Sequence, residues 1–161
     1  EALLALYVRK YKINARVVRV FNTYGPGMSF EDQRVIPQFM RSIATGEPIY
    51  IYGDGSQTRT HLYVDDLIRG ILLVMETGRA GEAYNIGGDK PITVRRLAEL
   101  MLGLTNRKNG ITYKPHFIED HNHRRPGVKK VRALGWQPRV SLKDGLKKIF
   151  MANDLKSLLR G

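Results

Sequence analysis

Apolar positions along the chain follow two periodicities, one typical of β-strands and one typical of α-helices. Short runs rich in β-branched and aromatic residues predict strands over 15–21, 47–53, 61–64, 82–88 and 110–119. Apolar residues spaced three and four apart predict helices over 1–12, 34–46, 65–78, 93–106, 128–135 and 141–159. Because strands and helices alternate, the pattern predicts an α/β fold.

Several residues mark the ends of the predicted helices. Pro37 suits an early turn of the helix over 34–46, where a missing backbone N–H costs little. Asp65 or Asp66 could cap the helix that begins there, and we interpret both as structural residues, not as an acid–base pair. The Ser-x-x-Asp pattern at 141–144 predicts a capped start for the last helix.

Length and composition narrow the class of protein. A chain of 161 residues with 42% hydrophobic residues can form one core, and so one domain or part of one. The absence of cysteine excludes disulfides, thiolate zinc sites and a cysteine nucleophile, and it is compatible with a reducing cytoplasm. No apolar run is long enough to span a bilayer, so we expect a cytoplasmic protein without a membrane partner.

The charge balance indicates an anionic partner. Lysine and arginine number 27 against 15 aspartates and glutamates, which gives a formal net charge of +12. Phosphates, nucleic acid and acidic membrane surfaces are all compatible with such a charge.

The segment YGDGSQTR offers one candidate anion site. Gly53 and Gly55 permit backbone angles that other residues avoid, Asp54 suits a tight turn, and Arg59 could grip a phosphate with two N–H groups. The alternative is an ordinary hairpin turn whose arginine lies in solvent. From these residues alone, both interpretations stay open.

Two other loops carry polar groups suited to an anionic ligand. Asn22 follows directly on the strand over 15–21, and ligands of α/β proteins gather beyond the carboxyl ends of strands. Arg124 and Arg125 stand side by side in a later loop and could neutralise a diphosphate. A plain turn at Asn22 and a solvated basic loop are the alternatives.

The loop before these arginines also holds residue types that can bind metal. Glu119, Asp120, His121 and His123 offer oxygen and imidazole ligands in close order. Such a short loop segment seldom makes a site, and we expect no metal there.

Taken in order, six segments carry a resemblance to a known family. They are RVFNTYGPGM, RVIPQFM, GEPIYIYGDGSQTRTHLYVDDLIRGI, GEAYNIGG, RRPG and LGWQPRVSLKDGL. This order closely resembles the carboxyl half of the extended short-chain dehydrogenase/reductases that modify nucleotide sugars. The motifs are most similar to those of the UDP-glucuronate decarboxylases, followed by the dTDP-glucose 4,6-dehydratases and the nucleotide-sugar 4-epimerases.

The resemblance implies that different parts of the enzyme bind NAD and the nucleotide sugar. The chain, 1–161, would be a single fragment comprising the end of the NAD-binding Rossmann domain and a small α/β nucleotide-sugar-binding lobe, without the amino-terminal NAD-binding half. In these enzymes the glycine-rich NAD-binding turn and a catalytic Tyr-x-x-x-Lys precede this region, and a glutamate matching Glu1 stands four residues beyond that lysine. We therefore expect no catalytic residue here, NAD only in the complete enzyme, and homodimerisation of that enzyme.

The resemblance also assigns substrate contacts, with a nucleotide-diphosphate sugar as the partner. It implies that Asn22 and Arg59 bind the diphosphate, that one of Arg124 and Arg125 completes the clamp, and that the nucleobase and the entering sugar nucleotide lie near Val35, Ile36 and Gln38.

The reaction within the family stays open. Family enzymes oxidise the sugar at C4 with bound NAD, and in the decarboxylases the keto acid loses carbon dioxide before the hydride returns. This chain has RRPG where the decarboxylases usually have Arg-x-Pro-Asp.

A basic nucleic-acid-binding module is the alternative from another class. It would use the net charge together with aromatic residues such as Tyr50, Tyr52, Tyr63 and Tyr113. These tyrosines sit in strand patterns that suit a core, and the basic residues are spread along the chain. We therefore expect no nucleic-acid partner.

Overall fold

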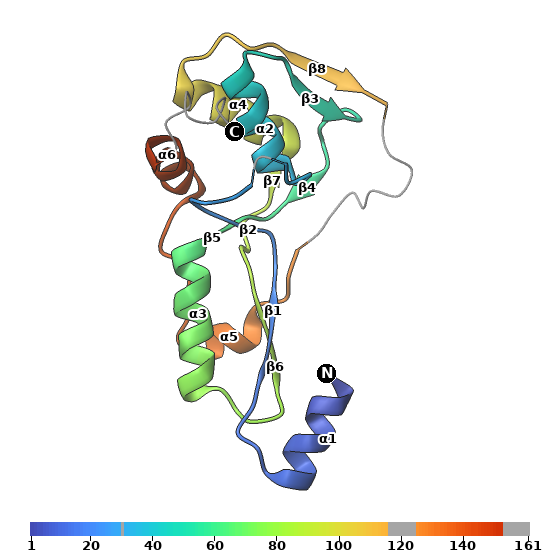
Figure 1. The fold of residues 1–161 in the computed structure, drawn as a ribbon, viewed down its shortest axis with the longest axis vertical. Coiled ribbons are helices and arrows are strands. Elements are labelled where there is room, and N and C mark those ends of the chain that lie inside the picture. The colour runs from blue at the N-terminus through green and yellow to red at the C-terminus, as the bar shows by residue number, and fades with distance from the viewer. Residues whose placement is uncertain (30, 116–124, 153–161) are drawn as a thin grey trace.

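The computed structural model describes residues 1–29, 31–115 and 125–152 (Figure 1). Its helices are α1 (Ala2–Tyr11), α2 (Val35–Thr45), α3 (Val64–Thr77), α4 (Val94–Thr105), α5 (Lys129–Ala133) and α6 (Leu142–Ala152). Its strands are β1 (Val17–Val20), β2 (Thr23–Tyr24), β3 (Ile49–Tyr52), β4 (Thr58–Arg59), β5 (Leu62–Tyr63), β6 (Ala83–Ile86), β7 (Ile92–Thr93) and β8 (Ile111–Lys114). The predicted α/β class is confirmed.

The strands pair mostly in parallel, as crossovers through helices require. Within the described residues, β1 pairs with β6, β2 with β5 and β3 with β8 in parallel, whereas β4 and β7 are antiparallel. Strands β3 and β4, which flank the glycine-rich loop, thus pair with other strands and not with each other. The hairpin interpretation of that loop is therefore wrong.

Buried apolar side chains form two clusters. The helices of the first cluster lie in the upper part of Figure 1, and those of the second lie below them. The lobe core lies among α2, α4, α6 and β3, and Phe39 and Leu97 are among its members. The sheet core lies among α3, α5 and the β1–β6 pair, and it includes Ile86 and Trp136. Successive residues of a strand point to opposite faces, so β5 sends Leu62 to the sheet core and Tyr63 to the lobe core.

The start of α3 corrects one sequence prediction. Neither Asp65 nor Asp66 caps the helix, because Tyr63 occupies the N-cap position and makes no side-chain cap bond. The buried carboxylate of Asp66 instead accepts hydrogen bonds at Oδ2 from the backbone N–H groups of Arg139 (3.0 Å) and Val140 (2.9 Å). Asp66 is thus structural, as predicted, but it joins segments far apart in the sequence.

Other predicted helix ends are confirmed. The N–H of Asp144 donates to Ser141 Oγ (3.1 Å), and the Ser141 hydroxyl donates to the Asp144 carboxylate (2.6 Å). Pro37 lies in the first turn of α2. The strand predicted over 110–119 is described only as far as 115, and the last predicted helix only as far as 152.

The exposed helix α1 lies at the lower end of Figure 1 and has no buried residue. Glu1 pairs with Arg19 of β1, with 2.5 Å between Glu1 Oε2 and Arg19 Nη2. Leu3, Leu6 and Val20 are all more than half exposed. In the described part of the chain, no helix has the length and apolar character that crossing a membrane requires.

Replacing Asp66 by Asn should lower the free energy of unfolding by about 2–4 kcal/mol. The amide offers one oxygen in place of two, so it cannot serve both the Arg69 guanidinium and the backbone donors of 139 and 140. Urea unfolding followed by circular dichroism measures the change. The control is Asp65→Asn, because Asp65 is exposed and lies 4.0 Å from Lys148 Nζ, a pair that contributes little. Equal effects of the two changes would contradict this account.

Two glycine-to-alanine changes should shift stability in opposite directions. A Cβ at Gly88 would lie 2.3 Å from the backbone oxygen of His61, so Gly88→Ala should destabilise the fold by about 1–3 kcal/mol. A Cβ at Gly103, exposed in α4, would meet nothing within 4 Å, so Gly103→Ala should stabilise it by roughly 0.5–1 kcal/mol. Thermal unfolding of both variants tests the pair, and a neutral Gly88→Ala would refute the close approach.

Candidate functional site

A cleft of about 340 Å³ opens between the amino end of α2, the strand β3 and the segment from β4 to β5. Five of the seven residues predicted to bind substrate line it: Asn22, Val35, Ile36, Gln38 and Arg59. Arg125 is exposed and is not among the lining residues, whereas Arg124 lies outside the described residues. Among the predicted residues, the fold thus brings Asn22 and Arg59, 37 positions apart, to one cleft.

The loop before β4 holds its shape through local hydrogen bonds. Gly53 and Gly55 have φ angles of 75° and 77°, in the region that favours glycine, as the sequence predicted. Asp54 Oδ1 accepts hydrogen bonds from the N–H (2.9 Å) and the hydroxyl (2.7 Å) of Ser56. The backbone oxygen of Gly55 accepts from the N–H of Arg95, which anchors the loop to α4.

The extended segment after this loop presents a row of polar side chains. Gln57, Arg59 and His61 all line the cleft, as alternate residues of an extended chain should. Arg59 is half-buried, and its Nη1 donates to the backbone oxygen of Thr58 (2.9 Å). The intervening Thr60 is buried and does not line the cleft.

Asn22 occupies the turn that leads from β1 into β2. Its φ of 31° is uncommon for a residue with a side chain, and asparagine is one of the residues that tolerate such values. Its backbone oxygen accepts from the N–H of Leu62 (3.1 Å), which fixes the turn against β5. The side-chain amide is therefore held at the carboxyl end of a parallel strand, where the sequence predicted a ligand contact.

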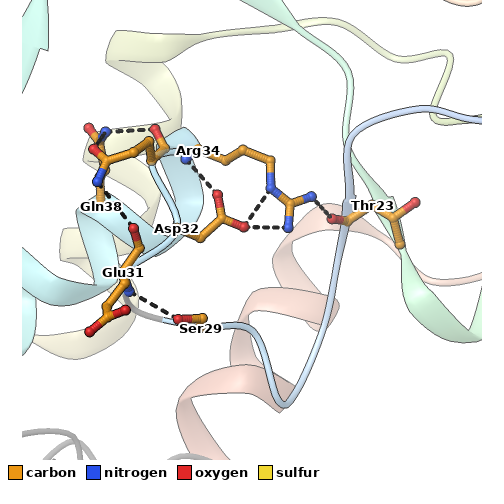
Figure 2. A network of polar contacts seen from close by, with 7 residues as sticks. Thr23, Ser29, Glu31, Asp32, Arg34 and Gln38 are labelled. Carbon is orange, nitrogen blue, oxygen red and sulfur yellow. Dashed lines mark hydrogen bonds and ion pairs between the residues drawn. The ribbon is translucent and has the colours of Figure 1, made fainter.

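A polar network fixes the wall formed by α2 (Figure 2). The Asp32 carboxylate accepts from both the backbone N–H and the Nε of Arg34 (2.8 Å each), and these hydrogen bonds hold the pKa of Asp32 below its usual value. Arg34 Nη1 then reaches across to the backbone oxygen of Thr23 in β2 (3.0 Å). Gln38 Nε2 donates to the Gln33 backbone oxygen (2.6 Å). The helix start that carries Val35 is therefore fastened to the opposite wall.

Aromatic side chains form the wall on the β3 side. Tyr50 and Tyr52 line the cleft together with Ile51, and Ile49 and Ile51 also belong to the lobe core. Lys114 Nζ lies 3.7 Å from the centroid of the Tyr50 ring, a cation–π contact. By contrast, Tyr63 is buried in the lobe core, so it is not available to stack on a nucleic-acid base.

His61 is a cleft residue that the sequence analysis did not single out. Burial, and then the charge of Arg59, lowers the pKa of its imidazole from 6.5 to about 4. The ring packs edge-on against Tyr24, with 6.2 Å between ring centroids. Its Nε2 is buried and has no hydrogen-bond partner. The period of two counted from Arg59 could have indicated both His61 and Gln57.

The metal candidates Glu119, Asp120, His121 and His123 lie outside the described residues. Among residues 1–29, 31–115 and 125–152, no three histidines or acidic residues are grouped so that they could hold a metal ion. The cleft instead combines a guanidinium, side-chain amides, an imidazole and aromatic rings. Such a set suits an anion linked to a planar ring and to hydroxyl groups.

Comparison with known sequences finds relatives that cover most of the chain. Residues 1–87 match the model of the NAD dependent epimerase/dehydratase family. UDP-glucuronic acid decarboxylase 1 of Arabidopsis thaliana is 35% identical over 158 residues, which is 98% of this chain and 36% of that protein. The chain thus spans about a third of the length of this curated relative.

Solved structures agree with both the fold and the family. The UDP-glucose 4-epimerase of Thermotoga maritima, solved with UDP-glucose, superposes with a TM-score of 0.87 at 34% identity, over 94% of this chain and 49% of the epimerase. A dTDP-glucose 4,6-dehydratase of Streptomyces venezuelae, solved with NAD, gives 0.82 at 32% identity, over 94% of this chain and 47% of the dehydratase. The resemblance inferred from the motifs is confirmed, and the chain belongs to the NAD dependent epimerase/dehydratase family.

Proposed function

We propose that this chain is the nucleotide-sugar-binding portion of an NAD-dependent enzyme that modifies nucleotide sugars. The observation that carries the proposal is the single cleft in which Asn22, Arg59 and the first turn of α2 meet. The proposed reaction is that of a UDP-glucuronate decarboxylase: oxidation at C4, loss of carbon dioxide and re-reduction to UDP-xylose. The similarity to the Arabidopsis decarboxylase supports this choice, and 4,6-dehydration or 4-epimerisation is the alternative.

In this proposal, different residues of the cleft contact different parts of the ligand. The Arg59 guanidinium and the Asn22 amide bind the diphosphate, whose two negative charges call for N–H donors. Val35, Ile36 and Gln38, at the start of α2, hold the nucleobase and admit the sugar nucleotide. The family resemblance supports one of Arg124 and Arg125 as a further cation for the diphosphate. Half-buried Arg59 binds an anion more strongly than an exposed arginine would, because water screens it less.

The cofactor belongs to the complete enzyme in this proposal. When bound, NAD accepts a hydride from the sugar and returns it. The 161-residue sequence contains neither a Gly-x-x-Gly-x-x-Gly turn nor a Tyr-x-x-x-Lys motif. Without them, this chain alone neither binds NAD with useful affinity nor turns over a sugar nucleotide.

The exposed apolar side chains near β1 support the proposed domain arrangement. In the described chain β1 has a strand partner on one side only, which leaves an open edge. Its Val20 is 52% exposed, although parallel sheets are normally covered on both faces. The amino-terminal NAD-binding half would add strands at this edge. The Leu3, Leu6 and Tyr7 side chains of α1, also exposed, offer a face for the homodimer that we propose for the complete enzyme.

Replacing Arg59 by Ala should weaken UDP binding by roughly tenfold to a hundredfold, because it removes a charge-assisted contact worth about 1.5–3 kcal/mol. Isothermal titration calorimetry of UDP into the 161-residue chain measures the loss. Because the contact is ionic, the difference between wild type and variant should shrink as salt rises.

The matched control is Lys147→Ala, which removes one positive charge from the exposed face of α6. UDP affinity should hardly change in this variant. Similar losses in the two variants would show that Arg59 acts only through the general positive field. A wild-type chain that does not bind UDP at all would refute the proposed function.

A further inference from the structure

Buried polar atoms without partners are concentrated beside the cleft. Within the described residues, four buried side-chain atoms have no hydrogen-bond partner, and three of them belong to the short stretch from Gln57 to His61. The three atoms are Gln57 Oε1, Thr60 Oγ1 and His61 Nε2. Native proteins leave few such atoms unpaired, because each one destabilises the fold. Two of the three, those of Gln57 and His61, belong to residues that line the cleft, where a ligand can supply the missing partner.

His61 differs from its two neighbours in this stretch. Gln57 lines the cleft, but its amide is already oriented by a bond from Nε2 to the backbone oxygen of Tyr52 (2.7 Å). Thr60 is buried and does not line the cleft. His61 combines a cleft position with an unpaired nitrogen, and its ring packs against that of Tyr24.

The position of His61 in the cleft indicates which part of a ligand it meets. Its backbone approaches Gly88, just beyond the carboxyl end of β6, and the adjacent Leu62 N–H bonds to Asn22. His61 therefore lies toward the carboxyl ends of the β1–β6 parallel pair, whereas Val35 and Ile36 belong to the start of α2. In the proposed binding mode, the nucleobase occupies the α2 end, so the sugar extends toward His61.

The charge state of the imidazole restricts its partner further. Burial and the adjacent Arg59 keep the ring neutral at physiological pH, since its pKa lies at about 4. A neutral imidazole offers one donor and one acceptor nitrogen, which matches a hydroxyl group better than an anion. Arg59 then serves the phosphate, and His61 serves the uncharged part of the ligand next to it.

We propose that His61 binds a hydroxyl group of the sugar moiety through its Nε2, and so distinguishes a nucleotide sugar from the bare nucleotide. This inference rests on the proposed function of the cleft. Rotation of the ring about its Cβ–Cγ bond, a broad torsion, turns Nε2 toward the ligand. Nε2 has no protein partner, so the rotation breaks no hydrogen bond of that nitrogen.

The test compares UDP-glucuronate with UDP in two variants of the 161-residue chain. His61→Phe keeps a flat ring against Tyr24 and removes both nitrogens. It should weaken UDP-glucuronate binding by about threefold to tenfold and leave UDP binding within about twofold. It should also raise the melting temperature by about 2–6 °C, because an unpaired buried polar atom is lost. A His61→Phe variant that is more stable but binds UDP-glucuronate more weakly shows that His61 acts in ligand binding, because the loss of a purely structural residue would lower stability.

Thr60→Val is the matched control, because it removes the neighbouring unpaired oxygen on the side away from the cleft. It should raise the melting temperature and leave the affinity for both ligands unchanged. The effect of His61→Phe should be equal at pH 6 and pH 8, since the imidazole stays neutral over this range.

Equal losses of UDP and UDP-glucuronate affinity in His61→Phe, or no loss of either, would overturn the assignment. If that variant does not fold, the ¹⁵N chemical shifts of the wild-type imidazole decide the matter. They should move on addition of UDP-glucuronate and not of UDP, and identical responses would refute the inference. If wild type binds UDP but the His61 tests fail, the proposed function stands and only the role of His61 is refuted. If wild type binds neither UDP nor UDP-glucuronate, the proposed function and the role of His61 are both refuted.

Discussion

The buried carboxylate of Asp66 fixes how the two cores of the molecule are placed relative to each other. A carboxylate with 1% exposure is tolerated only where hydrogen bonds and a counter-charge compensate the loss of water. Its partners are the Arg69 guanidinium on the same helix and the backbone of 139 and 140, just before α6. The Asp66 backbone oxygen also accepts from Trp136 Nε1 (3.0 Å), so the sheet core and the approach to α6 meet at one residue.

The position of α6 in turn shapes the floor of the cleft. Tyr24 donates its hydroxyl to the backbone oxygen of Leu142 (3.3 Å), and a Cβ at Gly145 would come within 2.3 Å of that hydroxyl. This close approach seats the Tyr24 ring against His61 and Tyr63. The constraint set at Asp66 therefore reaches the cleft through α6 and Tyr24, although Asp66 itself does not line the cleft.

Local signals made the secondary structure predictable, and long-range contacts decided what was not. Ser141 and Asp144 cap a helix through groups three residues apart, so their pattern could be interpreted from the sequence. The partners of Asp66 lie 73 and 74 residues away, and a capping rule could not anticipate them. The hairpin interpretation failed for the same reason, because β3 pairs with β8 and β4 with β7.

In the candidate site, too, local sequence patterns indicated some residues, and the fold was needed to find another. Asn22 and Arg59 stood out because a strand end and a glycine-rich turn are local features, and the family resemblance added the α2 residues. His61 was not singled out because no local motif marks it in the run THLYV. Its distinction, an unpaired nitrogen beside a cleft, exists only after folding. Arg125 met the criterion of charge, but charge alone does not determine which residues line a cleft.

The segment 57–61 secures its main chain without using the buried side-chain atoms Gln57 Oε1 and His61 Nε2. Strand β4 pairs with β7, strand β5 pairs with β2, and the backbone oxygen of Gln57 accepts from the N–H of Val94 (3.0 Å). These bonds secure the main chain on both sides of His61 without using its imidazole. A rigid backbone can therefore hold unpaired polar side chains in place, which lowers the ordering cost of binding and explains why the unpaired atoms gather beside the cleft.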